Sequence, residues 1–196
     1  MPQLTQIKET KKGRMALFFD GEFAFSLDAD TFAKADLHEE DLLEEWQIED
    51  LRKQSDTRRA LDKAMDYLSL RDHAAGELYQ KLCRKFDEHS AAYAVARAGE
   101  LGLLNDADFA RRRAAELLRK RKSRREILLD LTAKGIDRDT VAEADDGEDP
   151  ELANARALVE RHYAAKLAAG KRDQVAAALA RRGFSHSVIR AALAED

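Results

Sequence analysis

The sequence has few of the residues that interrupt helices or cross-link small folds. Proline occurs only at Pro2 and Pro150, so residues 3 to 149 lack the side chain that removes a backbone donor and clashes with the preceding helical turn. The single cysteine, Cys83, excludes an intramolecular disulfide framework and the paired Cys-x-x-Cys ligands of a zinc ribbon. Long helices are therefore allowed over most of the chain, and a reducing compartment is expected.

Long uncharged runs are also missing. No stretch approaches the ~18 to 20 uncharged residues needed to cross a bilayer, and the N-terminus lacks the apolar segment of a signal peptide. Charged residues make up 37% of the chain, but both signs are abundant and apolar residues recur regularly. The sequence predicts a folded, cytoplasmic protein with no membrane partner.

The usual signatures of catalysis are absent as well. The chain has no Gly-x4-Gly-Lys-Ser/Thr loop, no Gly-x-Gly-x-x-Gly, no His-Glu-x-x-His and no Gly-x-Ser-x-Gly. Its five histidines lack metal-ligand spacing and are interpreted as surface or helix-boundary residues: His38, His73, His89, His162 and His186. We therefore predict no enzyme activity, no metal site and no cofactor.

Two segments near the N-terminus alternate as strands do. Residues 14 to 19 and 22 to 27 flank Asp20-Gly21, a dipeptide suited to the positive φ angles of a type I′ hairpin turn. Met15, Leu17 and Phe19 alternate on one strand, and Phe23, Phe25 and Leu27 on the other, so one apolar face needs covering. A third strand near residues 4 to 8 and a small helix from about Thr31 are expected to complete this domain.

Helical spacing begins near Glu39, and a weak internal repeat follows it. Leu42, Leu43, Trp46 and Leu51 form a possible apolar stripe, on which we interpret Trp46 as a core residue. Further on, three apolar triplets align with offsets of 49 and 48 residues between their middle leucines: Leu78, Leu82, Phe86; Ile127, Leu131, Ile136; and Val175, Leu179, Phe184. This period is typical of stacked supersecondary units that share a core.

Each repeat divides into three helices. Leading helices are expected over about 57 to 70, 107 to 122 and 151 to 168, and middle helices end at Gly135 or Gly183. The third helices begin at the N-cap candidates Asp87, Asp137 and Ser185. The fold class is therefore mainly α, with tandem three-helix repeats in an elongated array and a small β-hairpin-containing N-terminal domain. The predicted domains are residues 1-56, 57-104, 105-146 and 147-196.

Charge is distributed unevenly along the chain. Residues 1 to 56 carry 7 Lys or Arg against 14 Asp or Glu, whereas residues 111 to 125 carry nine cations and one acid, Glu116. Nine like charges repel one another unless anions are near, which favours a binding surface over an ordinary solvated face. The candidate partner or DNA-binding residues are Arg112, Arg113, Arg119, Lys120, Arg121, Lys122, Arg124 and Arg125, with Lys171, Arg172, Arg181 and Arg182 as an extension.

One segment resembles a known family. Residues 101 to 111, Leu-Gly-Leu-Leu-Asn-Asp-Ala-Asp-Phe-Ala-Arg, are similar to the hallmark segment of the RecX regulators of the bacterial recombinase RecA. The helix ends Lys134-Gly135-Ile136-Asp137 and Arg182-Gly183-Phe184 resemble further family signatures. The resemblance covers about residues 57 to 193, and one departure is Ala74, which stands where the family favours Ser.

The resemblance implies a non-enzymatic regulator in DNA repair, recombination and the SOS response. Such a protein, a monomer, would lie along the groove of the recombinase–DNA filament and interfere with ATP hydrolysis, filament growth and strand exchange. The basic residues alone also permit a stand-alone DNA-binding protein that contacts phosphates without reading bases. The scarcity of aromatic residues near these cations disfavours stacking of single-stranded bases.

Overall fold

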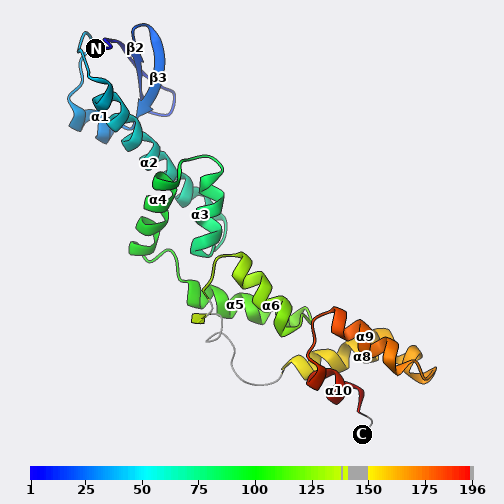
Figure 1. Ribbon diagram of the computed structural model, residues 1–196. Coiled ribbons are helices and arrows are strands. Elements are labelled where there is room, and N and C mark those ends of the chain that lie inside the picture. Colours follow the sequence, from blue (N-terminus) through cyan, green and yellow to red (C-terminus); the bar gives the residue numbers. More distant parts are fainter. Residues whose placement is uncertain (138, 141–149, 195–196) are drawn as a thin grey trace. The chain divides into compact units, whose positions relative to one another are not determined.

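The computed structural model describes residues 1–137, 139–140 and 150–194 of the chain (Figure 1). These residues form two compact units. Unit 1 comprises residues 1–71 and 78–103, and unit 2 comprises residues 72–77 and the described residues from 104 onward.

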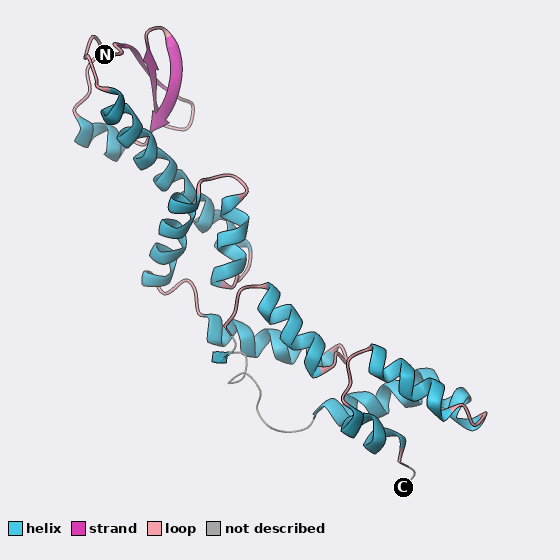
Figure 2. Cartoon of the chain, in the orientation of Figure 1, coloured by secondary structure: helices cyan, strands magenta, loops and turns pink. Residues whose placement is uncertain are grey.

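A three-stranded antiparallel sheet opens unit 1 (Figure 2). Its strands, in the order β1-β2-β3, are Leu4–Glu9, Met15–Phe19 and Glu22–Leu27. Asp20 and Gly21 have φ angles of 49° and 85°, as a type I′ turn requires. The predicted hairpin and the third strand are therefore confirmed.

The prediction that Phe23 shares the apolar face of Phe25 is wrong. Phe23 pairs with Phe18, but Phe25 pairs with Leu17, so β3 carries one extra residue between these two pairs. This bulge reverses the alternation of side chains. Phe25 is consequently buried, whereas Phe23 is 60% exposed and packs edge-on against the ring of Phe18.

Two helices cover the sheet. α1 is Ala29–Ala35, capped by the Asp28 carboxylate, which accepts from the Thr31 N–H, and α2 is Glu45–Leu70. Leu4, Leu17 and Leu27 of the sheet are fully buried, and their cluster includes Leu51 of α2. The small helix expected near Thr31 is thus confirmed.

The helix expected to start at residue 57 is the second half of α2, which runs unbroken for 26 residues. The first half packs on the sheet, while Ala60 and Ala64 in the second half are fully buried. The absence of proline and glycine from this segment permits such a length.

Trp46 is not a core residue, contrary to the sequence-based interpretation. Of the predicted stripe, Leu43 and Leu51 are buried, but Leu42 is 58% and Trp46 69% exposed. The reason is that α2 begins only at Glu45, with Glu44 as its N-cap, so Leu42 and Leu43 precede the helix and do not share its periodicity.

α3 and α4 complete the first three-helix repeat. They are Ala75–Cys83 and Glu88–Glu100, and the predicted cap Asp87 accepts from the Ser90 N–H at 3.0 Å. Leu78 and Leu82 of α3 and Ala91, Ala94 and Ala98 of α4 are fully buried. Small alanine side chains let α4 lie close against α2.

Unit 2 contains the helices α5 (Asp106–Arg119), α6 (Arg124–Ala133), α8 (Pro150–Ala168), α9 (Arg172–Arg181) and α10 (His186–Leu193). The expected caps are present, because Asp137 accepts from the Thr140 N–H and Ser185 from the Val188 N–H. Gly135 and Gly183 have φ angles of 79° and 89°, as predicted for residues that end the middle helices.

The aligned apolar triplets form the inner face of the middle helices and their ends. Eight of the nine residues are buried, and the ninth, Phe86, is half-buried beneath the Arg59 guanidinium. The mainly α class with three-helix repeats and a small β-containing N-terminal domain is confirmed.

Other parts of the predicted organisation stay predictions. The elongated arrangement and the four domain boundaries are among these, and the 56/57 boundary falls inside α2. Most of the third helix of the second repeat and the joint at residues 147 to 149 lie outside the described residues.

We expect Leu131→Ala or Leu179→Ala to lower the free energy of unfolding by ~2 to 5 kcal/mol, because both side chains are fully buried at the same position of their repeats. Urea denaturation measures the change. Leu129→Ala is the matched control, since Leu129 on α6 is 61% exposed. A midpoint equal to that of the parent for either buried variant would contradict the repeat alignment.

Candidate functional site

Several of the predicted basic residues already bind carboxylates of the same unit. Arg112 donates to Asp72 at 2.7 Å and contacts Asp108 at 2.8 Å. Lys122 donates to Glu126 at 2.7 Å. These three acids neutralise part of the positive charge of residues 111 to 125.

Arg113 is half-buried. Its guanidinium holds both oxygens of Asp130, at 2.8 and 2.9 Å, and also donates to Glu116 at 2.8 Å. The hydrogen bonds that Arg113 donates to Asp130 raise the pKa of Arg113 above its ordinary value and lower the pKa of Asp130 below its own. Arg113 therefore joins α5 to α6 as a structural ion pair.

Glu116 holds a second cation of the predicted site. Hydrogen bonds from Lys120 and from Arg113 lower the pKa of Glu116 to about 2. Glu116 therefore stays ionised at neutral pH and offsets charge at both positions.

The remaining cations are available to a partner. Within the described ranges, the following residues form no ion pair: Arg119, Arg121, Arg125, Lys171, Arg172, Arg181 and Arg182. All except Arg121 are exposed, and Arg121 is half-buried. The free charge thus lies at the end of α5, the start of α6 and the two ends of α9.

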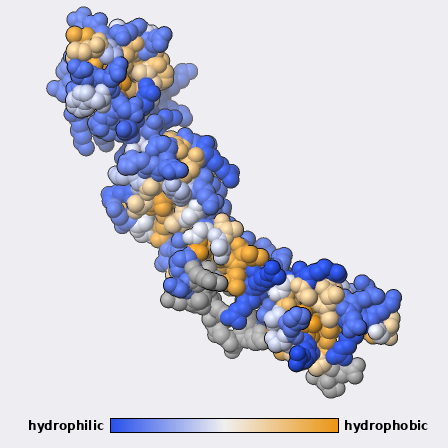
Figure 3. Space-filling model, viewed as in Figure 1, coloured by the Kyte–Doolittle hydropathy of each residue, from blue (hydrophilic) through white to orange (hydrophobic). Residues whose placement is uncertain are grey.

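A hydrogen bond joins the start of α6 to the end of α9. Ser123, the N-cap of α6, is fully buried, and its Oγ donates to the Arg182 carbonyl at 2.8 Å. A Cβ placed on Gly183 would lie 3.2 Å from Cβ of Arg125, so the end of α9 lies directly against the start of α6. Figure 3 shows a strongly hydrophilic surface where these two helix ends meet.

We call this region the junction cluster and define it by five arginines around Ser123. Its members come from two repeats. The sequence alone does not show that they form one site, because residues 124–125 and residues 181–182 are far apart along the chain. The members are Arg121, Arg124, Arg125, Arg181 and Arg182.

The same geometry recurs at the start of α3. The backbones of Gly76 and Gly135 approach so closely that a Cβ on Gly135 would lie 2.7 Å from Gly76 Cα. The Asp106 carboxylate accepts from the Ala75 N–H at 2.8 Å, and Glu151 does the same for Arg124 at 3.2 Å. Each acid satisfies an unpaired donor in the first turn of a middle helix.

The two junctions differ in one side chain. Ala74 occupies the position of Ser123 and has no side-chain oxygen, so only the second junction has the bond to a carbonyl. Sequence reasoning did not select Ser123, although its alignment with Ala74 and the repeated Gly135 and Gly183 corners were the signals available for finding it.

Arg121 occupies a backbone conformation that usually takes glycine. Its φ is +58°, and the Lys122 N–H donates to the Leu117 carbonyl, closing the turn that ends α5. At the corresponding end of α8, the residue is Gly170, with φ +70°. An arginine here costs stability and places a cation beside Ser123.

The histidines and acids do not form a metal site. The described residues contain no group of three or more His, Cys, Asp or Glu positioned to hold a metal ion. His73 is buried just before α3, whereas the other four histidines are exposed. None of the described helices is long and apolar enough to span a membrane.

Sequence comparison identifies relatives along the whole chain. Residues 60–97 match the first three-helix domain of RecX, and residues 105–144 match the second. Regulatory protein RecX of Bacillus subtilis is 30% identical over 207 residues, covering 98% of this chain and 76% of the relative. Regulatory protein RecX of Bacillus licheniformis is 30% identical over 209 residues, covering 100% and 78%.

Solved structures share the fold. A crystal structure of regulatory protein RecX superposes with a TM-score of 0.69 at 21% identity, covering 96% of this chain and 97% of that one. RecX from Lactobacillus salivarius gives a TM-score of 0.62 at 22% identity, covering 70% and 94%. The sequence matches confirm the resemblance to the RecX family, and the solved structures confirm its fold.

We expect Arg121→Gly to raise the free energy of unfolding by about 0.5 to 1 kcal/mol, because glycine adopts a φ of +58° without a Cβ clash. Thermal and urea denaturation measure the gain. Arg121→Ala is the matched control, since it removes the same charge but keeps the strain. Equal stability of the two variants would show that the backbone conformation costs nothing.

Acid should destabilise the protein through Glu116. Its folded-state pKa of about 2 lies below the ordinary 4.5, so its contribution is complete above about pH 5 and is lost as the pH falls toward 2. Asp130 acts in the same direction. We expect Arg113→Met to flatten the fall of the urea midpoint over this range, whereas Arg111→Met, at a looser pair, leaves the slope unchanged.

Proposed function

This chain belongs to the RecX family, and from that premise we propose that it is a non-enzymatic regulator of a RecA-type recombinase, acting in DNA repair and recombination. In this proposal the protein binds in the groove of the recombinase–DNA filament in the cytoplasm. Its main effect there is to inhibit ATP hydrolysis, filament growth and strand exchange.

The observation that carries the proposal is the junction cluster. Four of its five arginines are exposed, and Arg121, Arg125, Arg181 and Arg182 form no ion pair with any described residue, although the charge of Arg182 helps to lower the pKa of Glu126. Concentrated cations on a rigid surface attract an anionic partner and accelerate association with it. The paired residues Arg112 and Arg113 belong to the fold and contribute less to this surface.

Acidic protein is favoured over bare DNA as the direct contact. Binding of single strands without base reading commonly uses exposed aromatic rings for stacking. The exposed Phe, Tyr and Trp rings in the described ranges are Phe23, Trp46 and Tyr93, and all three belong to unit 1. The junction cluster therefore supplies charge without a stacking platform. A stand-alone DNA-binding protein remains the alternative function, favoured by the same exposed arginines.

Neutralising four unpaired cations tests the proposal. We expect a variant with Arg119, Arg125, Arg181 and Arg182 changed to Gln to lose at least tenfold in half-maximal inhibition of the RecA ATPase on single-stranded DNA, because its attraction to the filament falls. The charge-matched control changes four cations of unit 1 that already have acidic partners: Arg58, Arg59, Lys63 and Arg97.

Direct DNA binding distinguishes the two functions. If the arginines mainly contact phosphates, the affinity for bare single strands falls with salt, and the four substitutions flatten the logarithmic slope by roughly 3, at ~0.7 per contact. If they contact protein, bare-DNA binding stays weak in both proteins while filament binding collapses in the variant. Unchanged filament binding by the folded variant would contradict both functions.

A further inference from the structure

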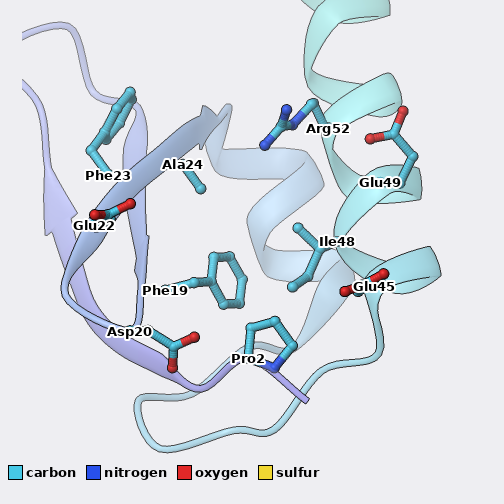
Figure 4. Close-up of a pocket in the computed structure, with 10 residues that line it drawn as sticks. All are labelled: Pro2, Phe19, Asp20, Glu22, Phe23, Ala24, Glu45, Ile48, Glu49 and Arg52. Carbon is cyan, nitrogen blue, oxygen red and sulfur yellow. The ribbon is translucent and has the colours of Figure 1, made fainter.

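The N-terminal part of unit 1 contains an open pocket that the proposed function does not use. Its volume is about 350 Å³, which suits one or two side chains. Figure 4 shows that Phe19, Ile48 and Pro2 converge on its centre, from β2, α2 and the chain start. The pocket therefore has an apolar floor.

An exposed aromatic side chain in the wall adds to the apolar surface of the pocket. Phe23 is 60% exposed in the wall of the pocket because the β3 bulge turns it outward. Trp46, 69% exposed, is next to the wall residue Glu45 in sequence but does not itself line the pocket. A large exposed ring in the wall of a pocket commonly marks a site for a partner.

Carboxylates flank the floor on two sides. In Figure 4, Asp20 and Glu22 lie on the hairpin side and Glu45 lies on the side of α2. Asp20 accepts from the Gln3 N–H at 3.0 Å, whereas Glu22 and Glu45 form no ion pair with any described residue. A negative field therefore borders an apolar centre.

The one cation of the pocket does not neutralise these acids. The Arg52 guanidinium lies 5.7 Å from the centroid of the Phe25 ring, in a cation–π contact, and has no carboxylate within ion-pair distance in the described part of the chain. Glu49, the remaining charged residue of the wall, adds further negative charge.

We propose that this pocket binds a segment of a protein partner in which an aliphatic side chain is flanked by Lys or Arg. The aliphatic group occupies the floor formed by Phe19 and Ile48, and the flanking cations reach Glu22 on one side and Glu45 on the other. The carboxylates repel phosphates, which disfavours nucleic acid as the occupant. The site is independent of the junction cluster and of the proposed function that rests on it.

Peptide titration of the full-length chain tests the proposal. The probe is the acetylated and amidated peptide Gly-Arg-Leu-Arg-Gly, and the readouts are the fluorescence of Trp46, the only tryptophan, and the amide resonances of residues 19–24 and 45–52. We expect saturable binding with a dissociation constant of ~1 mM or below that weakens as salt is raised. Replacing both arginines by Gln, or the leucine by Ser, should each weaken binding at least fivefold.

Protein variants locate the binding. Glu22→Gln with Glu45→Gln should weaken binding at least fivefold, whereas the control Asp62→Asn with Asp66→Asn, on the same helix as Glu45 but outside the pocket, should not. Circular dichroism checks that both double variants are folded. No binding, equal binding of the Gln peptide, or shifts outside the two segments would overturn the proposal. Shifts of the amide resonances of residues 19–24 and 45–52 on adding oligo-dT, or on self-association of the protein, would also overturn it.

Discussion

Close packing at two glycine corners governs how the helices of unit 2 meet one another. The Gly135 corner presses on the Gly76 backbone, where a Cβ would come within 2.7 Å, and the Gly183 corner presses on the Oγ of Ser123 in the same way. A positive φ and the lack of a Cβ are both required at these corners, so only glycine fits without strain. The recurrent Lys-Gly and Arg-Gly helix ends are therefore packing surfaces as well as helix terminators.

This packing also decides which charges are free. Because the middle helices α3 and α6 each start against the following repeat, their first N–H groups are within reach of an acid from the next leading helix, Asp106 for α3 and Glu151 for α6. Those two acids are occupied by backbone donors, and Glu116 and Asp130 are occupied by side chains. The acids near the basic block are thus largely committed to the fold, which leaves Arg121, Arg125, Arg181 and Arg182 without an ion pair among the described residues.

Local rules predicted most of the elements but not their partners. Turn chemistry at Asp20-Gly21 and caps such as Asp87 depend on neighbours in sequence, and these predictions are confirmed. The predictions for Phe23 and Trp46 are wrong because the β3 bulge and the start of α2 at Glu45 change which residues share a face. Neither feature changes the spacing of apolar residues in the sequence. The Arg113–Asp130 pair and the Ser123–Arg182 bond join residues 17 and 59 positions apart, so no spacing rule within one helix finds them.

The unbroken α2 has a consequence for chain length. The first turns of α2 form a wall of the N-terminal pocket, and its last turns pack against α4. The number of residues between these two faces therefore fixes the angle between them. Inserting a single residue near the middle of α2 would rotate one face against the other by about 100° and advance it by ~1.5 Å. A seven-residue insertion would restore the angle to within about 20° while separating the faces by roughly 10 Å. Length changes in this helix should therefore be tolerated in steps of whole turns, and loop-like variation should be excluded from it.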